Sequence, residues 1–116
     1  MKTNKNNKKT EESEHRLFEV IAQIRDAAEA QQFFEDLCTP AERQVMADRW
    51  EVVEPLKAGK SYREIYDDTG VSITTIGRVA RCINLGTDGY NLIYKRVTKN
   101  AKKKTQNSTA KKGPPK

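Results

Sequence analysis

The 116-residue chain has few of the residues from which catalytic and metal sites are built. It contains one histidine, His15, and two cysteines, Cys38 and Cys82, far apart in the sequence. These residues cannot supply the closely spaced ligands of a zinc site. His15 falls at the polar start of an expected helix, where a solvated side chain is expected rather than a catalytic base. No Gly-rich phosphate loop and no Cys/His/Asp set occurs. The protein is therefore not expected to be an enzyme, and no catalytic residue, metal ligand or cofactor is predicted.

Long apolar runs are also absent. No stretch approaches the roughly 20 apolar residues that a membrane helix needs, and no apolar signal-peptide core follows the basic N-terminus. Both cysteines fall at apolar positions of expected helices, which favours free, buried thiols in a reducing cytoplasm. Strand-like alternation and internal repeats are missing as well. We expect an all-α, cytoplasmic protein without a membrane partner.

Acidic residues are missing from both ends of the chain. Residues 1–10 carry four lysines and residues 95–116 carry nine basic residues, with no acid in either segment. Residues 11–94 therefore contain all 16 acids and 22 − 4 − 9 = 9 basic residues. The net charge of this central part is −7, and that of the two ends together is +13. An acidic body can bind DNA only through a local basic face. The basic ends either add a salt-sensitive attraction or are simply solvated, disordered arms.

Apolar residues at steps of three and four predict six helices. The first begins at Ser13, with a stripe that runs to Ala28, and a second spans 31–38. A third opens at Thr39-Pro40, where Thr39 caps the helix and Glu42 completes a capping box. Pro55 should kink or end this helix. The fourth and fifth helices form the pair described next, and the sixth runs from the loop at 84–89 to Val97. We expect a helical domain at 13–97, a disordered basic arm at 1–12 and a disordered Lys-rich tail at 98–116.

Residues 61–84 carry the pattern with the most functional content, a helix, a tight turn and a second helix. Ser61 and Glu64 form a capping box for the first helix, and Gly70 can take the positive φ that reverses the chain. Ser72 caps the second helix. Its expected apolar stripe comprises Ile73, Ile76, Val79, Ala80 and Ile83. The remaining side chains would face outward, as a helix that enters a DNA major groove requires.

This pair predicts a DNA-binding surface. Thr74, Thr75 and Arg78 would face the groove, beside the exposed edge of Ser72. The expected phosphate contacts are Lys57, Lys60, Arg63 and Arg81. Tyr66 departs from the pattern, because the position four residues before the turn glycine is usually small. Its ring must either splay the two helices slightly or slide outward.

A single copy of such a domain would expose much apolar surface. The expected first helix has a broad apolar face that includes Leu17, Phe18 and Ile21, and the last helix is apolar on more than one side. Small domains are marginal unless they oligomerise. A dimer also places two reading helices on half-sites about one DNA turn apart. Both arguments predict a two-fold homodimer.

A set of residues between positions 39 and 84 matches a known family. The set is Thr39-Pro40, Glu42-Arg43, Arg49, Val53-Glu54, Gly59, Ser61, Arg63-Glu64, Gly70, Ile73, Thr75-Ile76 and Arg78. On these residues the chain resembles the Trp repressor superfamily, and in particular its TrpR-related YerC/YecD-type proteins of Gram-positive bacteria. The resemblance implies an intertwined homodimer of six-helix protomers in which the first, third and last helices interlock. It also implies sequence-specific DNA binding by the helix at 72–84 and repression of transcription.

The resemblance also implies a place for a small-molecule effector. Thr39, Arg49 and Arg78 match the Trp repressor residues that hold its corepressor tryptophan, and guanidinium groups suit a carboxylate. Val79 stands where the Trp repressor has a glycine, so a branched side chain would fill the space for an indole. Cys82 replaces a serine and is a poor partner for an ammonium group. The five residues are a candidate effector pocket, but tryptophan is not its expected ligand.

Other roles for these arginines stay open. Arg49 and Arg78 would otherwise pair with nearby acids such as Glu42 or Asp48, or contact phosphate. A corepressor of unknown identity also stays open.

Two functions follow from the sequence. The leading hypothesis is a homodimeric, sequence-specific DNA-binding regulator, a repressor, that reads double-stranded DNA through residues 61–84. The alternative is a helical dimeric interaction or architectural protein with only non-specific DNA affinity, which Tyr66 and the acidic body favour. RNA binding is not expected, because the chain has no aromatic stacking platform.

Overall fold

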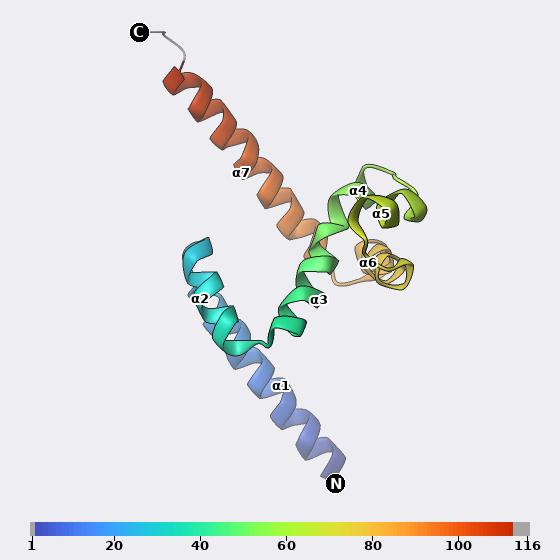
Figure 1. The fold of residues 1–116 in the computed structure, drawn as a ribbon. Coiled ribbons are helices and arrows are strands. Elements are labelled where there is room, and N and C mark those ends of the chain that lie inside the picture. The colour runs from blue at the N-terminus through green and yellow to red at the C-terminus, as the bar shows by residue number, and fades with distance from the viewer. Residues whose placement is uncertain (1, 113–116) are drawn as a thin grey trace. The chain divides into compact units, whose positions relative to one another are not determined.

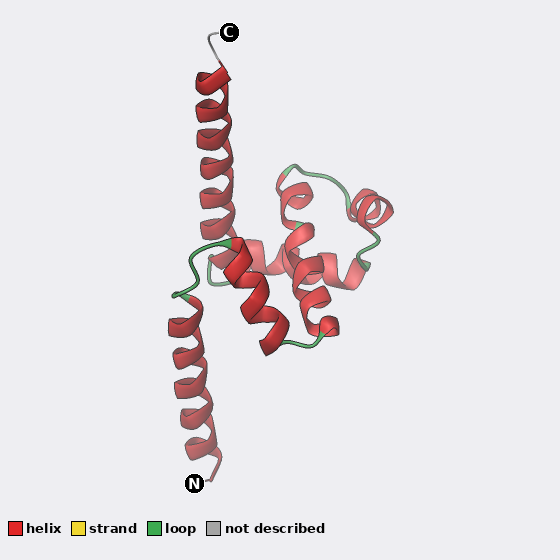
Figure 2. Cartoon of the chain, turned by 60° about the vertical axis from the view of Figure 1, so that its left-hand side comes forward, coloured by secondary structure: helices red, strands yellow, loops and turns green. Residues whose placement is uncertain are grey.

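The computed structural model describes the backbone of residues 2–112 and the side chains of residues 7–103. In this part of the chain the regular structure is helical, and no strand occurs (Figure 2). The helices are α1 (Lys2–Ile21), α2 (Ala27–Leu37), α3 (Pro40–Glu51), α4 (Val53–Lys57), α5 (Tyr62–Thr69), α6 (Ile73–Leu85) and α7 (Gly89–Lys112) (Figure 1). The all-α class is confirmed. The six predicted helices are present, and the third is divided into α3 and α4.

The break between α3 and α4 lies at one residue, Val52, whose φ is −91° and ψ is −2°. Pro55 is the third residue of α4. Proline lacks an N–H, and the first N–H groups of a helix have no partner inside it, so Pro55 costs α4 no hydrogen bond. In one continuous helix it would have removed a bond and crowded the carbonyl of Glu51. The predicted effect of Pro55 is therefore seen as the break in the helix at Val52, three residues before the proline.

Two compact units make up the chain, and the first comprises Met1–Arg43. α1 ends at Ile21 and α2 begins at Ala27, so the first helix ends earlier than predicted and the second begins earlier. α1 ends in a tight turn, in which the N–H of Gln23 donates to the carbonyl of Val20 at 3.0 Å. Asp26 then starts α2, because its backbone is extended and its carboxylate accepts from the N–H of Glu29 at 2.9 Å. Glu29 in turn accepts from the N–H of Arg25 at 2.9 Å. The spacing of Asp26 and Glu29 is a capping signal that the apolar periodicity concealed.

The start of α3 forms the predicted capping box. The N–H of Thr39 donates to Oε1 of Glu42 at 2.8 Å, and the N–H of Glu42 donates to Oγ1 of Thr39 at 3.2 Å. The hydrogen bond that the carboxyl of Glu42 accepts from the Thr39 backbone, and after it one from the Thr39 side chain, lowers the pKa of this carboxyl below its ordinary value, because both bonds favour the charged form. Glu42 is therefore ionised and holds the cap at neutral pH.

The second unit, Gln44–Lys116, contains every buried side chain of the described residues. Its core comprises Val52, Val53, Ile65, Val71, Ile76 and Val79. Four partly buried residues pack against this core, namely Leu56, Ile83, Tyr90 and Tyr94. α4 contacts α5, α6 and α7, and α6 contacts α5 and α7. The pair α5 and α6 is thus held in place by α4 and by the start of α7.

Both terminal segments are helical in the structure, whereas disordered arms are expected from the composition. α1 begins at Lys2 and α7 extends to Lys112. Neither residues 2–12 nor residues 98–112 contain glycine or proline, and lysine and glutamate are good helix formers. A helix that is already nucleated can therefore propagate into these segments at little cost. The domain boundaries at 13 and 97 stay a prediction.

No helix in residues 2–112 combines the length and the apolar character that a membrane-spanning segment needs.

Candidate nucleic-acid interface

α5 and α6 form a helix-turn-helix with its caps at the predicted residues. Oγ of Ser61 accepts from the N–H of Glu64 at 3.1 Å, and Oγ of Ser72 accepts from the N–H of Thr75 at 3.1 Å. Gly70 has a φ of 76°, and its N–H donates to the carbonyl of Tyr66 at 2.8 Å. This φ is unfavourable for residues with a Cβ, so glycine permits the reversal.

Thr69 supports the turn in a way that the sequence pattern does not reveal. Its hydroxyl donates to the carbonyl of Ile65 at 2.7 Å and accepts from the N–H of Val71 at 3.1 Å. The turn is therefore held from both sides of Gly70. Since Ile65 and Val71 are both core residues, these two bonds connect the turn directly to the core.

The two helices approach each other through buried aliphatic side chains. Ile65 of α5 and Ile76 and Val79 of α6 are fully buried. Tyr66 is 46 % exposed, so its ring lies at the surface and does not separate the helices. Of the two arrangements that the sequence left open for this residue, the structure has the outward one. A large side chain at this position is compatible with a closely packed helix-turn-helix.

The outward face of α6 presents Thr74, Arg78 and Arg81. These residues recur at steps of four and three, and all are exposed. Their side chains have no hydrogen bond or ion pair within the part of the chain that the structure describes. Thr75 differs from the prediction. It is half-buried, and its hydroxyl accepts from Oγ of Ser72 at 3.0 Å. Ser72 and Thr75 are therefore engaged at the helix cap.

Ile73 was assigned to the buried stripe, but it is 46 % exposed. It is the first residue of α6, and the buried stripe begins only at Ile76, where α5 packs. An exposed aliphatic side chain at this end of a reading helix can contact a thymine methyl group. The position of Ile73 directly after the N-cap is the sequence signal that indicates its exposure.

Two of the predicted phosphate contacts, Lys60 between α4 and α5 and Arg63 on α5, are engaged with other protein groups. Nζ of Lys60 lies 3.5 Å from Oδ2 of Asp68, and Nε of Arg63 lies 3.6 Å from Oδ1 of Asp67. Both pairs are solvent-exposed, and such pairs contribute little, so a phosphate could compete with the carboxylates. The positive charge of these two residues is, however, offset locally by the two acids.

Lys57 points to α7 instead. Its Nζ donates to Oδ1 of Asn91 and lies 5.3 Å from the centre of the Tyr94 ring. Nδ2 of Asn91 donates to the carbonyl of Ile83 at 3.0 Å and to Oδ1 of Asp88 at 2.8 Å. Lys57 is therefore part of a polar network that joins α4, the end of α6 and the start of α7. Its phosphate role stays a prediction.

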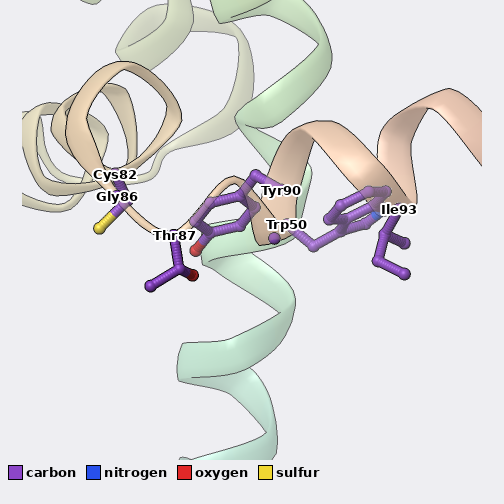
Figure 3. Close-up of a pocket in the computed structure, with 7 residues that line it drawn as sticks. Trp50, Cys82, Gly86, Thr87, Tyr90 and Ile93 are labelled. Carbon is purple, nitrogen blue, oxygen red and sulfur yellow. The ribbon is translucent and has the colours of Figure 1, made fainter.

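An apolar hollow of about 550 Å³ lies between α3, the end of α6 and the start of α7 (Figure 3). The residues that line it are Trp50, Cys82, Gly86, Thr87, Gly89, Tyr90 and Ile93. The rings of Trp50 and Tyr90 stack, with centroids 6.4 Å apart and 18° between their planes. A second hollow of about 360 Å³ is lined by Arg78, Arg81, Cys82, Leu85 and Gly86. In the described residues, no three His, Cys, Asp or Glu side chains gather as a metal site.

Comparison with known proteins identifies the family. The sequence profile of the Trp repressor protein matches residues 12–98, about three quarters of the chain. The chain belongs to the Trp repressor family. YerC of Bacillus subtilis strain 168, an uncharacterised protein, is 44 % identical over 81 residues, which cover 70 % of this chain and 78 % of YerC.

Two solved structures share the fold of this Trp repressor family member. A TrpR-like protein from Eubacterium eligens ATCC 27750 superposes with a TM-score of 0.70 at 38 % identity, covering 75 % of this chain and 90 % of that protein. A candidate Trp repressor from Staphylococcus aureus superposes with a TM-score of 0.70 at 36 % identity, covering 74 % of this chain and 86 % of that protein.

The predicted effector residues of this family member do not line one common hollow. Val79 is fully buried in the core, and it is not a lining residue of either hollow. Cys82 lines both hollows, and Arg78 lines the smaller one beside Arg81. Thr39 belongs to the first unit, where it caps α3. The structure thus brings Arg78 and Cys82 together, and it assigns Val79 a packing role.

The acids expected to neutralise Arg49 and Arg78 are engaged elsewhere. Asp48 accepts from Nε2 of Gln44 at 2.8 Å, and Glu42 holds the Thr39 cap. No ion pair involves either arginine in the part of the chain that the structure describes. Both guanidinium groups are therefore available to an anion.

Proposed function

We propose that the chain is a homodimeric DNA-binding regulator that represses transcription and reads its operator through α6. The observation that carries this proposal is the division of α6 into two faces. Ile76 and Val79 hold one face in the core, while Thr74, Arg78 and Arg81 stand exposed and unpaired on the other. A threonine near the helix start followed by two arginines offers hydroxyl and guanidinium groups to base edges and phosphates. Membership of the Trp repressor family supports the same function.

The dimer is supported by what a single chain leaves exposed. None of the described side chains of the first unit is buried, and Phe18 is 59 % exposed. In the second unit Leu92, Ile93 and Val97 of α7 are exposed as well. Apolar surface on this scale favours a partner. A second copy of the chain would cover it and would bring two α6 helices to the two half-sites of one operator.

Selection of binding sites from a pool of random DNA duplexes tests the proposed function. The full-length protein is expected to enrich a palindromic sequence whose half-sites lie about one helical turn apart. Salt-sensitive binding without any enriched sequence would contradict the proposal. That outcome would support the second candidate, a helical dimeric interaction or architectural protein with only non-specific DNA affinity.

Arg78 and Lys60 should differ in what they contribute to binding. Arg78→Ala is expected to weaken operator binding by roughly 1–3 kcal/mol and to relax one operator position, because it removes a contact to a base. Lys60→Ala should weaken all duplexes alike, by less, and lower the salt dependence, since Lys60 is proposed to contact a phosphate and is already paired with Asp68. Fluorescence anisotropy with the selected operator and single-base variants measures both effects. A change of base preference in Lys60→Ala would contradict the assignment of Lys60 to phosphate.

We further propose that the dimer binds its operator without tryptophan. Cys82 offers no good acceptor to an ammonium group. A small anion held by the unpaired Arg49 or Arg78 stays compatible with the structure.

A further inference from the structure

The middle of α7 carries a row of basic side chains on one face. Lys95, Lys99, Lys102 and Lys103 lie at steps of four, three and one, and Arg96 lies beside them. At 3.6 residues per turn these five positions fall within an arc of about 120°. All five side chains are exposed. We refer to these five residues as the α7 ridge.

The opposite side of α7 packs against the body of its own unit. Tyr94 packs against the core, and Tyr94, Val97, Thr98 and Ala101 line a hollow together with side chains of α3 and α4. Tyr94 and Ala101 thus lie on the side of the helix that is turned toward Trp50 and Val53. The ridge therefore faces away from the body, and its orientation follows from the packing of α7 rather than from the charges.

The charges of the ridge are not neutralised by the protein. No acidic residue occurs from position 95 to the C-terminus. None of the five ridge residues takes part in an ion pair in the described part of the chain, whereas Lys60 and Arg63 each have an aspartate partner. Five like charges on one helix face repel one another. A polyanion would relieve this repulsion and release its own counterions.

The dimensions of the ridge suit a nucleic-acid backbone. From Lys95 to Lys103 the ridge spans eight residues, about 12 Å at 1.5 Å per residue. One strand of duplex DNA places a phosphate about every 3.4 Å along its axis, so roughly three or four phosphates fit this length. A membrane surface is less suitable, because a helix that lies on a bilayer inserts an apolar face, whereas every residue of the ridge is basic.

We propose that the α7 ridge is a second phosphate-binding surface, which contacts the DNA backbone apart from the helix-turn-helix. The inference rests on the proposed DNA-binding function. The family match ends at residue 98, so most of the ridge lies beyond it. The ridge adds affinity that is independent of sequence, while α6 supplies the sequence preference. In this way an acidic body holds DNA firmly without a general basic surface.

A charge-neutral variant of the ridge tests this proposal. Lys95, Lys99, Lys102 and Lys103 are replaced by glutamine, which removes four charges and keeps a similar helix propensity. The matched control replaces Lys104, Lys111, Lys112 and Lys116 by glutamine, which changes the net charge equally in the same segment. Circular dichroism checks that both variants keep the helical fold. Anisotropy titrations use the selected operator and a scrambled duplex over a series of salt concentrations.

The ridge variant should lower the slope of log K against log salt by about 3–4, because each phosphate that a lysine neutralises accounts for about 0.9 of the slope. The slope should fall equally for both duplexes, the ratio of their affinities should stay within about twofold, and the control should change the slope by less than about one. An unchanged slope in the ridge variant, or an equal decrease in the control, would overturn the proposal.

Two further measurements separate this inference from its alternatives. If the unmodified protein shows no operator preference, the proposed sequence reading fails, but the scrambled duplex still tests the ridge. Vesicles of phosphatidylserine and phosphatidylcholine at a ratio of about 1:3 test an anionic lipid surface. Vesicle binding that depends on the ridge, combined with an unchanged slope for DNA, would assign the ridge to a membrane and overturn the proposal.

Discussion

Val79→Gly should lower the free energy of unfolding by about 2–4 kcal/mol. Val79 is fully buried among Val52, Ile65 and Ile76, and removal of its side chain leaves a cavity in a core of only six buried residues. Glycine inside a helix adds about 1 kcal/mol relative to alanine. Domains of this kind are stable by about 5–15 kcal/mol, so the decrease is a large fraction of the total.

Urea denaturation followed by circular dichroism measures this decrease. Asn84→Gly is the matched control, because Asn84 is an exposed residue of the same helix and asparagine and glycine differ by only a few tenths of a kcal/mol in helix propensity. If the two substitutions cost the same, Val79 does not have the packing role that the structure assigns to it.

The burial of Val79 also changes the tryptophan binding that is expected of a variant at this position. From the sequence alone, Val79→Gly combined with Cys82→Ser would be expected to open a tryptophan site. Because Val79 is a core residue, the double variant should instead be destabilised and should still not bind L-tryptophan at millimolar concentration. Calorimetric titration of tryptophan into the unmodified protein and into the double variant gives the answer. A dissociation constant below about 100 μM in a folded double variant would show that the family's effector site persists here.

Phe18→Asp should convert the proposed homodimer into a monomer. Phe18 is 59 % exposed in the single chain, and the described part of its unit has no buried side chain, so the ring is expected to be an anchor of the dimer. Removal of a buried aromatic anchor costs about 2–4 kcal/mol, which raises the dissociation constant roughly 30- to 1,000-fold. The unmodified chain has a mass of 13.2 kDa and should sediment at twice this mass at micromolar concentration.

Sedimentation equilibrium over a range of concentrations measures the dissociation constant of the dimer for Phe18→Asp and for a control variant, Gln23→Asp. Gln23→Asp introduces the same charge in the same unit at an exposed polar residue, so it should leave the dimer intact. Equal weakening by both substitutions would mean that charge alone, and not the removal of the ring, separates the protomers. A monomer mass for the unmodified chain at micromolar concentration would contradict the proposed dimer itself.

Local signals in the sequence predicted the helix-turn-helix of α5 and α6 well. Ser61, Ser72 and Gly70 each act within four residues of the chain, through a hydrogen bond or a φ value that the residue type itself favours. Such short-range effects need no tertiary contact. The same reasoning predicted the cap at Thr39, and it could have revealed the cap at Asp26, where apolar periodicity was given more weight than the capping pair.

Burial and pairing were decided by the tertiary structure. Ile73 and Val79 lie on one helix and have similar side chains, yet one is 46 % exposed and the other 0 %, because only Val79 belongs to the core that includes Val53 of α4 and Ile65 of α5. Lys57 binds Asn91, 34 residues away in the sequence, and a sequence pattern cannot indicate which of many exposed lysines will find such a partner. The sequence alone therefore determined the helices, their caps and the turn, because neighbouring residues control these. The tertiary structure determined which helix faces are buried and which are exposed, because exposure depends on packing between distant segments.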